Sequence, residues 1–484
     1  MTLLGWYILN YRGLKRTAEF FLSGMSLFFY AYFNPSYLFI ILSSILVNYC
    51  LSFILERIES KKCGKIILAL GLIFNLGLLF YYKYYDFFIS NMNALFKTDW
   101  ALKNILLPLG ISFFTFQQLS FIIDRCKGEC EHYAFGDYLT FVTFFPQLVA
   151  GPIVLYDEMM EQFGDEERKK FNPENFYKGI LLFSIGLGKK VLLADVLANV
   201  ANYGFDNVIF MDSISTFLCG LAYAFELYFD FSGYSDMAIG LGKMFNIDLP
   251  VNFDSPYQAA SMKELWNRWH ITLSRFFIRY VYIPLGGSRK GRVRADINLF
   301  IVFMLSGLWH GAAWTYVVWG CMQGLLLIYD NLHLTGVRGA DKKGEPKLAI
   351  PKVCGQFLTF NAFLATLFVF RADSLGDALQ CFKNIFSFKI TGYLPKLMEK
   401  IDIPEFYLVK ELLNMKAPGL LNTAYLILFL LFMAISVFII SRKNALTLVE
   451  EYHDKKGLAL WCGLILVWSV ISFSQVSTFI YFNF

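Results

Sequence analysis

Charged residues are scarce in this 484-residue chain. Asp, Glu, Lys and Arg make up 17% of it, whereas an ordinary soluble domain contains roughly 25%. Hydrophobic residues make up 57%, and the mean hydropathy is +0.49. The shortage of charge argues against a soluble protein. Apolar stretches of about 20 residues, each long enough to cross a bilayer, recur along the whole sequence.

The sequence also lacks the motifs of several functional classes. It has neither a glycine-rich nucleotide-binding loop nor a sustained basic stripe, so we expect no bound cofactor and no nucleic-acid partner. It has no repeat of fixed period, which weakens a transporter built from repeats. The nine cysteines are odd in number, and Cys126 and Cys130 lack a second cysteine pair. We therefore predict no disulfide framework and no metal site.

The apolar stretches predict the fold. No small-residue cleavage site follows the first stretch, so we interpret it as a retained span rather than a signal peptide. We predict an all-α, multi-pass integral membrane domain covering residues 1–484, with about 11 to 12 transmembrane helices and additional interfacial amphipathic helices. The candidate spans are residues 17–33, 35–57, 65–89, 104–123, 136–156, 175–197, 213–242, 295–333, 354–370, 423–441 and 457–480.

Basic residues flank the outer ends of the first two spans. They are Arg12, Lys15 and Arg16 before the pair, and Arg57, Lys61 and Lys62 after it. Positively charged loops stay on the cytoplasmic side of a membrane. Both outer ends of this first hairpin are therefore expected in the cytoplasm.

The apolar span 295–333 is too long for a single crossing. Residues 297–329 contain no charged side chain over 33 positions, or about 50 Å as helix against a hydrocarbon core of about 30 Å. The span must tilt, break or fold back, and glycines at 307, 311 and 320 are the candidate break points. His310 lies between two of them, near an expected cavity.

His310 is the candidate catalytic residue. An imidazole at bilayer depth costs free energy unless a partner or a task holds it there. A neutral ring can act as a general base that takes the proton of an acceptor hydroxyl as the hydroxyl attacks a thioester, a step worth about 10²- to 10⁴-fold in rate. The alternative is a histidine that only hydrogen-bonds a neighbouring helix.

Residues 263–287 are predicted to form one amphipathic helix at a membrane boundary or along a polar cavity. At 100° per residue, Trp266, Trp269 and His270 share an aromatic face, while arginines at 268, 275 and 279 share the opposite face. On this evidence His270 could orient His310, bind the acyl carbonyl or simply pack.

The span 213–242 carries Glu226, Asp230 and Asp236. Carboxylates inside a membrane span usually face a protein interior or water. We expect them to pair with an arginine, such as one of the three above, rather than to act in catalysis. Our hypothesis is that they organise a substrate tunnel.

Eight short segments in this order carry a family resemblance: Leu107–Phe113, Phe145–Pro152, Tyr228–Gly240, Trp266–His270, Tyr282–Gly287, Gly307–Gly311, Phe370–Ala372 and Phe479–Phe482. Each is weak alone. Together they resemble the membrane-bound O-acyltransferase family, within it the alginate O-acetyltransferase-like branch, over nearly the whole chain. The resemblance implies a many-helix fold around a central tunnel or funnel, with 263–287 and 295–333 forming the catalytic core. His310 then matches the family's essential histidine, and His270 matches its second histidine.

The resemblance also guides the other site residues. We expect Trp266, Trp269, Trp309, Arg268, Arg279, Asp230 and Asp236 to line the tunnel or contact substrate. Two positions depart from the family's pattern: Tyr280 follows Arg279 where relatives usually carry Asp, and Glu226 stands where Gln is frequent. These departures concern the acceptor or relay details and leave the histidines untouched.

We therefore predict an O-acyltransferase, with acetyl as the expected group. It would move an acyl group from a cytoplasmic thioester, acetyl-CoA or an acyl carrier protein, across the membrane to hydroxyls of a cell-surface polysaccharide. The resemblance implies a bacterial cytoplasmic (inner) membrane location and a separate extracytoplasmic acetyltransferase partner. Three alternatives stay open: D-alanyl or other acyl transfer to a cell-wall polymer, a proton-coupled transporter or flippase for an envelope precursor, and a silent scaffold for a secreted transferase. Whether His310 takes a proton or the acyl group also stays open.

Overall fold

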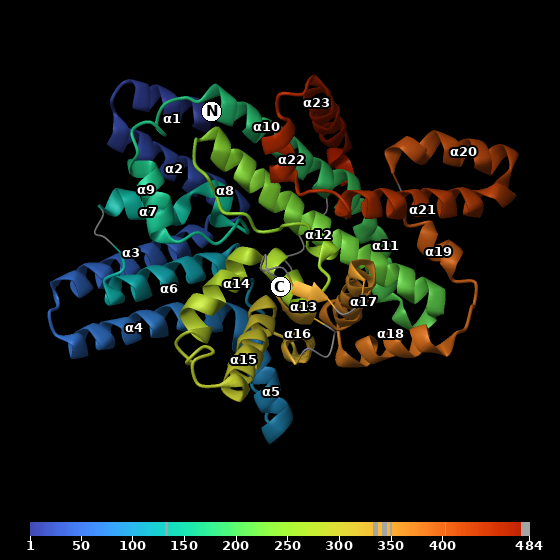
Figure 1. Ribbon diagram of the computed structural model, residues 1–484, viewed down its shortest axis with the longest axis horizontal. Coiled ribbons are helices and arrows are strands. Elements are labelled where there is room, and N and C mark those ends of the chain that lie inside the picture. Colours follow the sequence, from blue (N-terminus) through green and yellow to red (C-terminus); the bar gives the residue numbers. More distant parts are fainter. Residues whose placement is uncertain (131–133, 333–336, 341–345, 349–350, 402, 476–484) are drawn as a thin grey trace. The chain divides into compact units, whose positions relative to one another are not determined.

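The computed structural model describes residues 1–130, 134–332, 337–340, 346–348, 351–401 and 403–475 (Figure 1). Helices make up most of these residues. The named strands among them are β1 (Val337–Ala340) and β2 (Pro346–Leu348), which pair antiparallel. The predicted all-α fold is confirmed. The predicted landmark Phe479–Phe482 lies outside the described residues.

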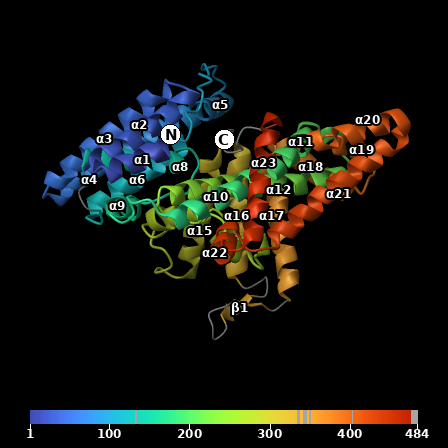
Figure 2. The ribbon, with the colours of Figure 1, turned by 90° about the horizontal axis from the view of Figure 1, so that it is seen from above.

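The chain divides into two compact units. The first comprises residues 1–183 and 237–251. In it, α2, α3, α4 and α6 lie side by side, as Figures 1 and 2 both show. Its helices are α1 (Thr2–Tyr11), α2 (Lys15–Phe33), α3 (Tyr37–Arg57), α4 (Lys61–Leu79), the π-helical η1 (Phe80–Tyr84), α5 (Tyr85–Phe96), α6 (Ile111–Lys127), α7 (Phe135–Thr143), α8 (Phe145–Leu148) and α9 (Tyr156–Gly164).

The second unit comprises residues 184–236 and 252–484. Two long helices, α10 (Pro173–Gly188) and α12 (Ser213–Met244), have their ends in different units. The other α- and π-helices are η2 (Lys189–Ala194), α11 (Asp195–Asp206), α13 (Met262–Arg268), α14 (Ile271–Phe277), η5 (Ile278–Tyr282), α15 (Arg292–His310), α16 (Trp314–Asn331), α17 (Lys352–Arg371), α18 (Leu375–Ser387), α19 (Leu394–Met398), α20 (Tyr407–Lys416), α21 (Leu421–Ile440), α22 (Ala445–Tyr452) and α23 (Lys456–Ile471). Short 3₁₀ turns are η3 (Val208–Phe210), η4 (Pro256–Gln258), η6 (Pro404–Phe406), η7 (Pro418–Leu420) and η8 (Ser472–Gln475).

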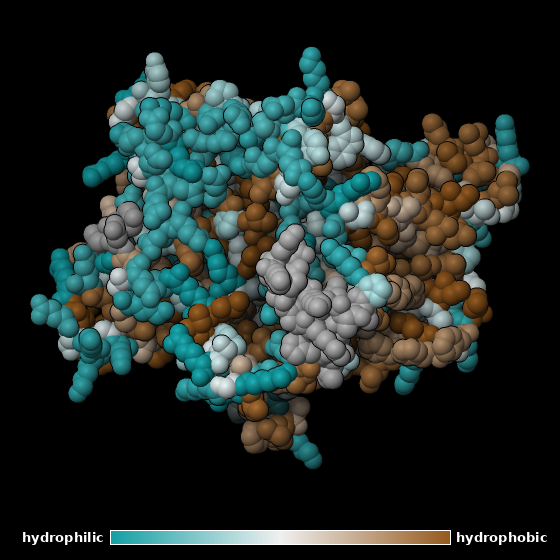
Figure 3. Space-filling view, viewed as in Figure 1, coloured by the Kyte–Doolittle hydropathy of each residue, from teal (hydrophilic) through white to brown (hydrophobic). Residues whose placement is uncertain are grey.

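Five helices among the described residues are long and apolar enough to cross a membrane: Tyr37–Arg57, Lys61–Phe96, Ser213–Met244, Lys352–Arg371 and Pro418–Ile440. This is fewer than the eleven or twelve predicted. Some predicted spans, such as 136–156, are interrupted and yield shorter helices, whereas α2 and α15 are 19 residues long but are not apolar enough. Figure 3 shows hydrophobic side chains gathered over α18, α20 and α21. Unlike the others, Ser213–Met244 has 78% of its most apolar window buried, which suits a helix that carries carboxylates.

The overlong span 295–333 breaks where glycine was predicted to allow it. α15 ends at His310, α16 begins at Trp314, and the two helices pack against each other along their length. Gly307 and Gly320 lie at their crossing: a Cβ on Gly307 would overlap the Tyr316 carbonyl oxygen and lie 2.9 Å from the Gly320 Cα. Small residues thus let the two backbones approach closely, as in other membrane helix pairs.

The predicted single amphipathic helix over 263–287 is wrong. Three elements, α13, α14 and η5, cover most of this range, and the chain leaves the helical conformation at Trp269 and His270. His270 has φ 44° and ψ 52°, in the left-handed region. The 100° periodicity therefore cannot be continued through residue 270, and the predicted faces do not hold beyond it.

Candidate active site

His310 is the last residue of α15 and is 3% exposed. Its ring lies among three aromatic rings in mainly edge-to-face contacts. The ring centroids are 5.0 Å from Trp309, 5.2 Å from Trp319 and 5.4 Å from Phe370. Trp319 comes from α16 and Phe370 from α17, so three helices build this enclosure.

The helix end has an electrostatic consequence for His310. The carbonyl groups of the last turn give a helix C-terminus a partial negative charge, which favours a cation there by about 0.3 to 2 kcal/mol. A histidine that accepts a proton at this place forms an imidazolium at the favourable end of α15. The aromatic rings around it exclude water, so this interaction is weakly screened.

His270 is held by a backbone pairing to the segment that follows α12. Asp254 N–H donates to the Arg268 carbonyl at 2.9 Å, and Ile271 N–H donates to the Asn252 carbonyl at 3.0 Å. These bonds flank an isolated bridge between Phe253 and Trp269. A left-handed, non-glycine residue costs free energy and persists only where its surroundings fix it. The pairing is the feature that fixes it.

The side chain of Asn252 orients the His270 ring. Its Oδ1 lies 3.2 Å from His270 Nδ1 and accepts hydrogen bonds from the Thr272 N–H at 3.3 Å and the Thr272 hydroxyl at 3.0 Å. Because the backbone N–H can only donate, it identifies this atom as the amide oxygen. An oxygen acceptor requires a proton on His270 Nδ1, which leaves the lone pair of the neutral ring on Nε2.

The charge state of His270 agrees with this arrangement. The residue is 1% exposed, and burial lowers its pKa to about 3. The ring is therefore neutral at physiological pH. Sequence reasoning missed Asn252, because it lies 18 positions before His270 and no local pattern joins the two.

Trp309 brings the two predicted histidines together. Its ring centroid is 5.0 Å from that of His310 and 6.0 Å from that of His270. Two of the other predicted tryptophans extend the same cluster. Trp266 lies 6.0 Å from Trp319 and donates to Gln323 Oε1 at 3.3 Å, while Trp269 stacks at a tilt on Phe363 at 5.3 Å.

Two of the three carboxylates of α12, Asp230 and Asp236, meet lysines and not the predicted arginines. Lys190 Nζ lies 2.7 Å from both Asp230 Oδ1 and Asp195 Oδ1, and Lys189 Nζ lies 2.7 Å from Asp236 Oδ2. All five side chains are buried. The π-helical turn of η2 presents the two consecutive lysines toward α12. Such turns often occur at functional sites.

The two arginines of the predicted site lie elsewhere. Arg268 NH2 pairs with Glu264 Oε1 at 2.9 Å and its side chain is 30% exposed, so it faces away from the histidines' enclosure. The Arg279 guanidinium lies 5.6 Å from the Tyr280 ring centroid, within η5. Glu226 is buried one turn before Asp230.

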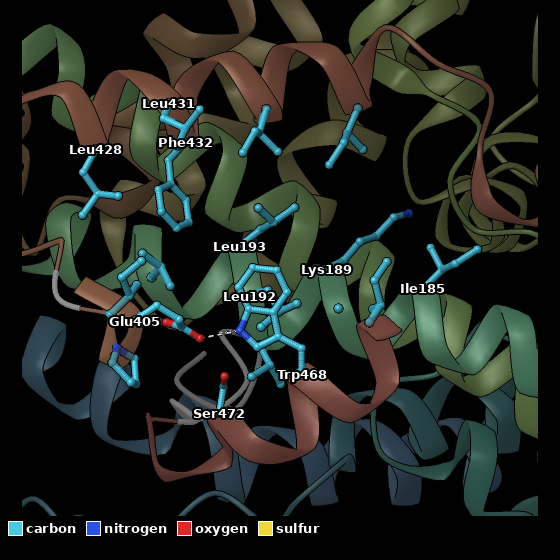
Figure 4. A pocket seen from close by; sticks show the side chains of 18 of the residues that line it. Ile185, Lys189, Leu192, Leu193, Glu405, Leu428, Leu431, Phe432, Trp468 and Ser472 are labelled. Atoms are coloured by element: carbon cyan, nitrogen blue, oxygen red, sulfur yellow. Dashed lines mark hydrogen bonds between the residues drawn. The ribbon is translucent and has the colours of Figure 1, made fainter. Parts of the chain in front are cut away.

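A cavity of about 340 Å³ lies near the lysines but not at the histidines. Figure 4 shows it between α21, η2 and α23, with the Trp468 indole donating to the Glu405 carboxylate at one edge. Most of its lining is aliphatic or aromatic, including Leu193 and Phe432. Neither histidine lines it. This cavity suits a hydrocarbon chain better than the polar chemistry expected at His310.

Comparison with known proteins identifies the family of the chain. The family model described as "MBOAT, membrane-bound O-acyltransferase family" matches residues 100–366. A peptidoglycan O-acetyltransferase of Helicobacter pylori is 40% identical over 410 residues, covering 79% of this chain and 76% of that protein.

Two further relatives represent other cell-envelope acyltransferases. A probable alginate O-acetylase of Pseudomonas aeruginosa is 35% identical over 368 residues, covering 74% of this chain and 68% of that protein. A teichoic acid D-alanyltransferase of Streptococcus thermophilus is 27% identical over 288 residues, covering 55% and 69%. The predicted resemblance is confirmed, and this multi-pass chain belongs to the membrane-bound O-acyltransferase family.

Proposed function

We propose that the protein transfers an acetyl group from a cytoplasmic thioester to hydroxyl groups of a cell-surface polysaccharide or cell-wall glycan. The observation that carries the proposal is the placement of His310 and His270 against the same buried indole, Trp309. The acceptor class is supported by relatives named for peptidoglycan, alginate and teichoic acid. The greater identity to the two O-acetylating relatives favours acetyl over D-alanyl.

In the proposed reaction the acceptor hydroxyl oxygen attacks the thioester carbonyl carbon. His310 takes the hydroxyl proton, the carbon–sulfur bond breaks, and the thiolate leaves and receives the proton. The end of α15 stabilises the imidazolium that forms between these steps. If His310 instead carries the acetyl group, the same neutral ring attacks the thioester first, and the hydroxyl then attacks the acetylimidazole.

Trp319 is the candidate donor to the oxyanion of the tetrahedral intermediate. Its indole Nε1 is buried and has no hydrogen-bond partner among the residues that the structure describes, and its ring lies beside that of His310. A buried donor of this kind calls for an explanation. Trp319→Phe keeps an aromatic ring but removes the N–H, and should lower kcat by about 10²-fold with a smaller effect on KM.

The donor and partners complete the proposal. Acetyl-CoA and an acetylated acyl carrier protein both present the required thioester from the cytoplasm. A separate extracytoplasmic acetyltransferase is the expected partner on the far side of a bacterial inner membrane. His310 and His270 are the catalytic pair, and the lysine–carboxylate cluster of η2 and α12 holds α12 in place behind them.

The test uses the full chain in proteoliposomes with radiolabelled acetyl-CoA outside and a soluble glycan acceptor inside. Wild type should transfer label. His310→Ala should lose at least about 10²-fold of the rate, while His453→Ala, at the end of α22, should not. Transport of an envelope precursor without acyl transfer would contradict the proposal. A wild-type chain that neither transfers nor hydrolyses the thioester, with either donor, would favour a scaffold.

A further inference from the structure

A basic cavity lies in the first unit, formed by two segments far apart in sequence. One is the end of α1 with the turn that follows, and the other is the loop between α9 and α10. The cavity has a volume of about 610 Å³. Its lining residues are Tyr7, Ile8, Asn10, Tyr11, Arg12, Lys15, Glu166, Lys169, Lys170 and Phe171.

The charges on this cavity favour an anion. Four cations line it against a single carboxylate, Glu166. Glu166 Oε2 lies 2.6 Å from Lys15 Nζ, and Lys169 Nζ lies 3.6 Å from both Glu166 Oε1 and Glu19 Oε1, the latter outside the lining. Lys170 pairs with Glu167, which is not part of the lining. Arg12 is exposed and forms no ion pair with any residue within the described ranges, so its guanidinium remains available for a ligand.

An apolar stripe adjoins the basic cavity. Leu4, Ile8 and Tyr11 are 63%, 42% and 94% exposed. Their spacing of four and three residues places them on one face of α1. Ile8 and Tyr11 belong both to this stripe and to the cavity lining. In Figure 3, hydrophilic side chains gather over the region of α1 and α9. The site therefore has a charged region and an apolar region that adjoin each other at Ile8 and Tyr11.

We propose that this cavity binds the phosphate headgroup of an anionic phospholipid from the cytoplasmic leaflet, with the acyl chains along the apolar stripe of α1. Arg12 and Lys170 would contact the phosphate oxygens, because guanidinium and ammonium groups form strong charge-assisted hydrogen bonds to phosphate. The flanking basic residues predict that this end of the first span is cytoplasmic, where anionic lipids attract basic clusters. The combination of charge and exposed apolar surface fits an amphiphile better than a soluble phosphate. This inference is independent of the acetyl-transfer proposal.

The experiment measures lipid binding to the purified full chain in detergent by native mass spectrometry. Phosphatidylglycerol should bind more tightly than phosphatidylcholine. The double variant Arg12→Gln/Lys170→Gln should weaken phosphatidylglycerol binding by about 30-fold. The matched control Lys61→Gln/Lys62→Gln removes two exposed lysines from the start of α4 and should leave binding unchanged.

A gain of affinity separates the proposal from simple misfolding. Glu166→Gln removes the one lining carboxylate and should tighten phosphatidylglycerol binding by about 5-fold. Equal binding of the two lipids, or equal losses in the control and the cavity variant, would overturn the proposal. So would displacement of the lipid by coenzyme A or inorganic phosphate at matched concentration, which would assign the site to a soluble phosphate ligand.

Discussion

Asn252 offers the sharpest test of how the site is held. Its Oδ1 accepts hydrogen bonds from His270 Nδ1 and from the N–H and hydroxyl of Thr272 at 3.0 to 3.3 Å. Asn252→Ala removes this acceptor and leaves two buried N–H donors without it. Each buried donor left without an acceptor costs about 1 to 3 kcal/mol. The donor–acceptor distances are long, which favours the lower half of this range, so for two donors we expect a loss of roughly 2 to 4 kcal/mol in the free energy of unfolding.

The same change should lower the acetyl-transfer rate. Without Asn252 the His270 ring loses the acceptor that holds its Nδ1 proton and its orientation. Misplacement of a catalytic group by about 1 Å costs on the order of 10²-fold in rate. We expect that loss in kcat, with KM for the donor little changed, because Asn252 acts through His270 as a positioning residue.

Asn252→Asp separates orientation from charge. The amide nitrogen of Asn252 has no hydrogen-bond partner among the residues that the structure describes, so aspartate keeps every accepted bond and loses none. It adds a negative charge beside His270, which raises the pKa of the imidazole. The aspartate variant should remain folded, and its kcat should fall as the pH is lowered in a range where wild type is flat.

The measurements are kcat against pH from 5 to 9 and the melting temperature for wild type and both variants. A wild-type kcat for Asn252→Ala in a folded protein would refute the role of this hydrogen-bond cluster. Identical pH profiles for Asn252→Asp and wild type would refute the protonation assigned to His270.

Three further predictions follow from the same contacts. Gly307→Ala should lower the free energy of unfolding by about 1 to 3 kcal/mol and reduce activity, because the added Cβ overlaps α16. As a control, Gly463→Ala changes an exposed position on α23 with nothing within 4 Å, and its melting temperature should be unchanged or higher. Lys190→Met should destabilise by about 3 to 5 kcal/mol by leaving its carboxylates uncompensated, and Asp230→Asn in the same chain should restore part of this loss, which a double-mutant cycle measures. Burial lowers the pKa of His270 to about 3, so the stability that its neutral form contributes is complete above pH about 6.5 and is lost toward pH 3 at about 1.4 kcal/mol per pH unit. His270→Gln should therefore reduce the change in melting temperature between pH 7 and 5, and an unchanged dependence of melting temperature on pH would contradict the assignment.

Hydropathy predicted the positions of several helices and one of their interruptions, but not the others. The apolar runs around α3, α12, α17 and α21 are continuous, and each is a helix long enough to span. The break after His310 was accessible, because an uncharged run of 33 residues exceeds the bilayer. The break at His270 was not. The aromatic pattern continues through it, and the bonds that produce it come from Asn252 and Asp254, outside any local window.

The charged cluster could have been predicted more closely. Buried carboxylates need cations, and the sequence places Lys189 and Lys190 inside an apolar run, where the same rule applies to lysine. The span with buried carboxylates and the span with buried lysines could therefore have been paired, which joins α12 to η2. The arginines of the amphipathic segment need no such partner, because they can be solvated by water. This pairing bears on the site. The ring centroid of Phe231, the neighbour of Asp230, lies 4.7 Å from that of His270, so Lys190, which pairs with Asp230, also holds one wall of the histidine's surroundings. We therefore expect Asp230 to act on His270 through the position of α12, so that its replacement alters the orientation of the ring before it alters the chemistry.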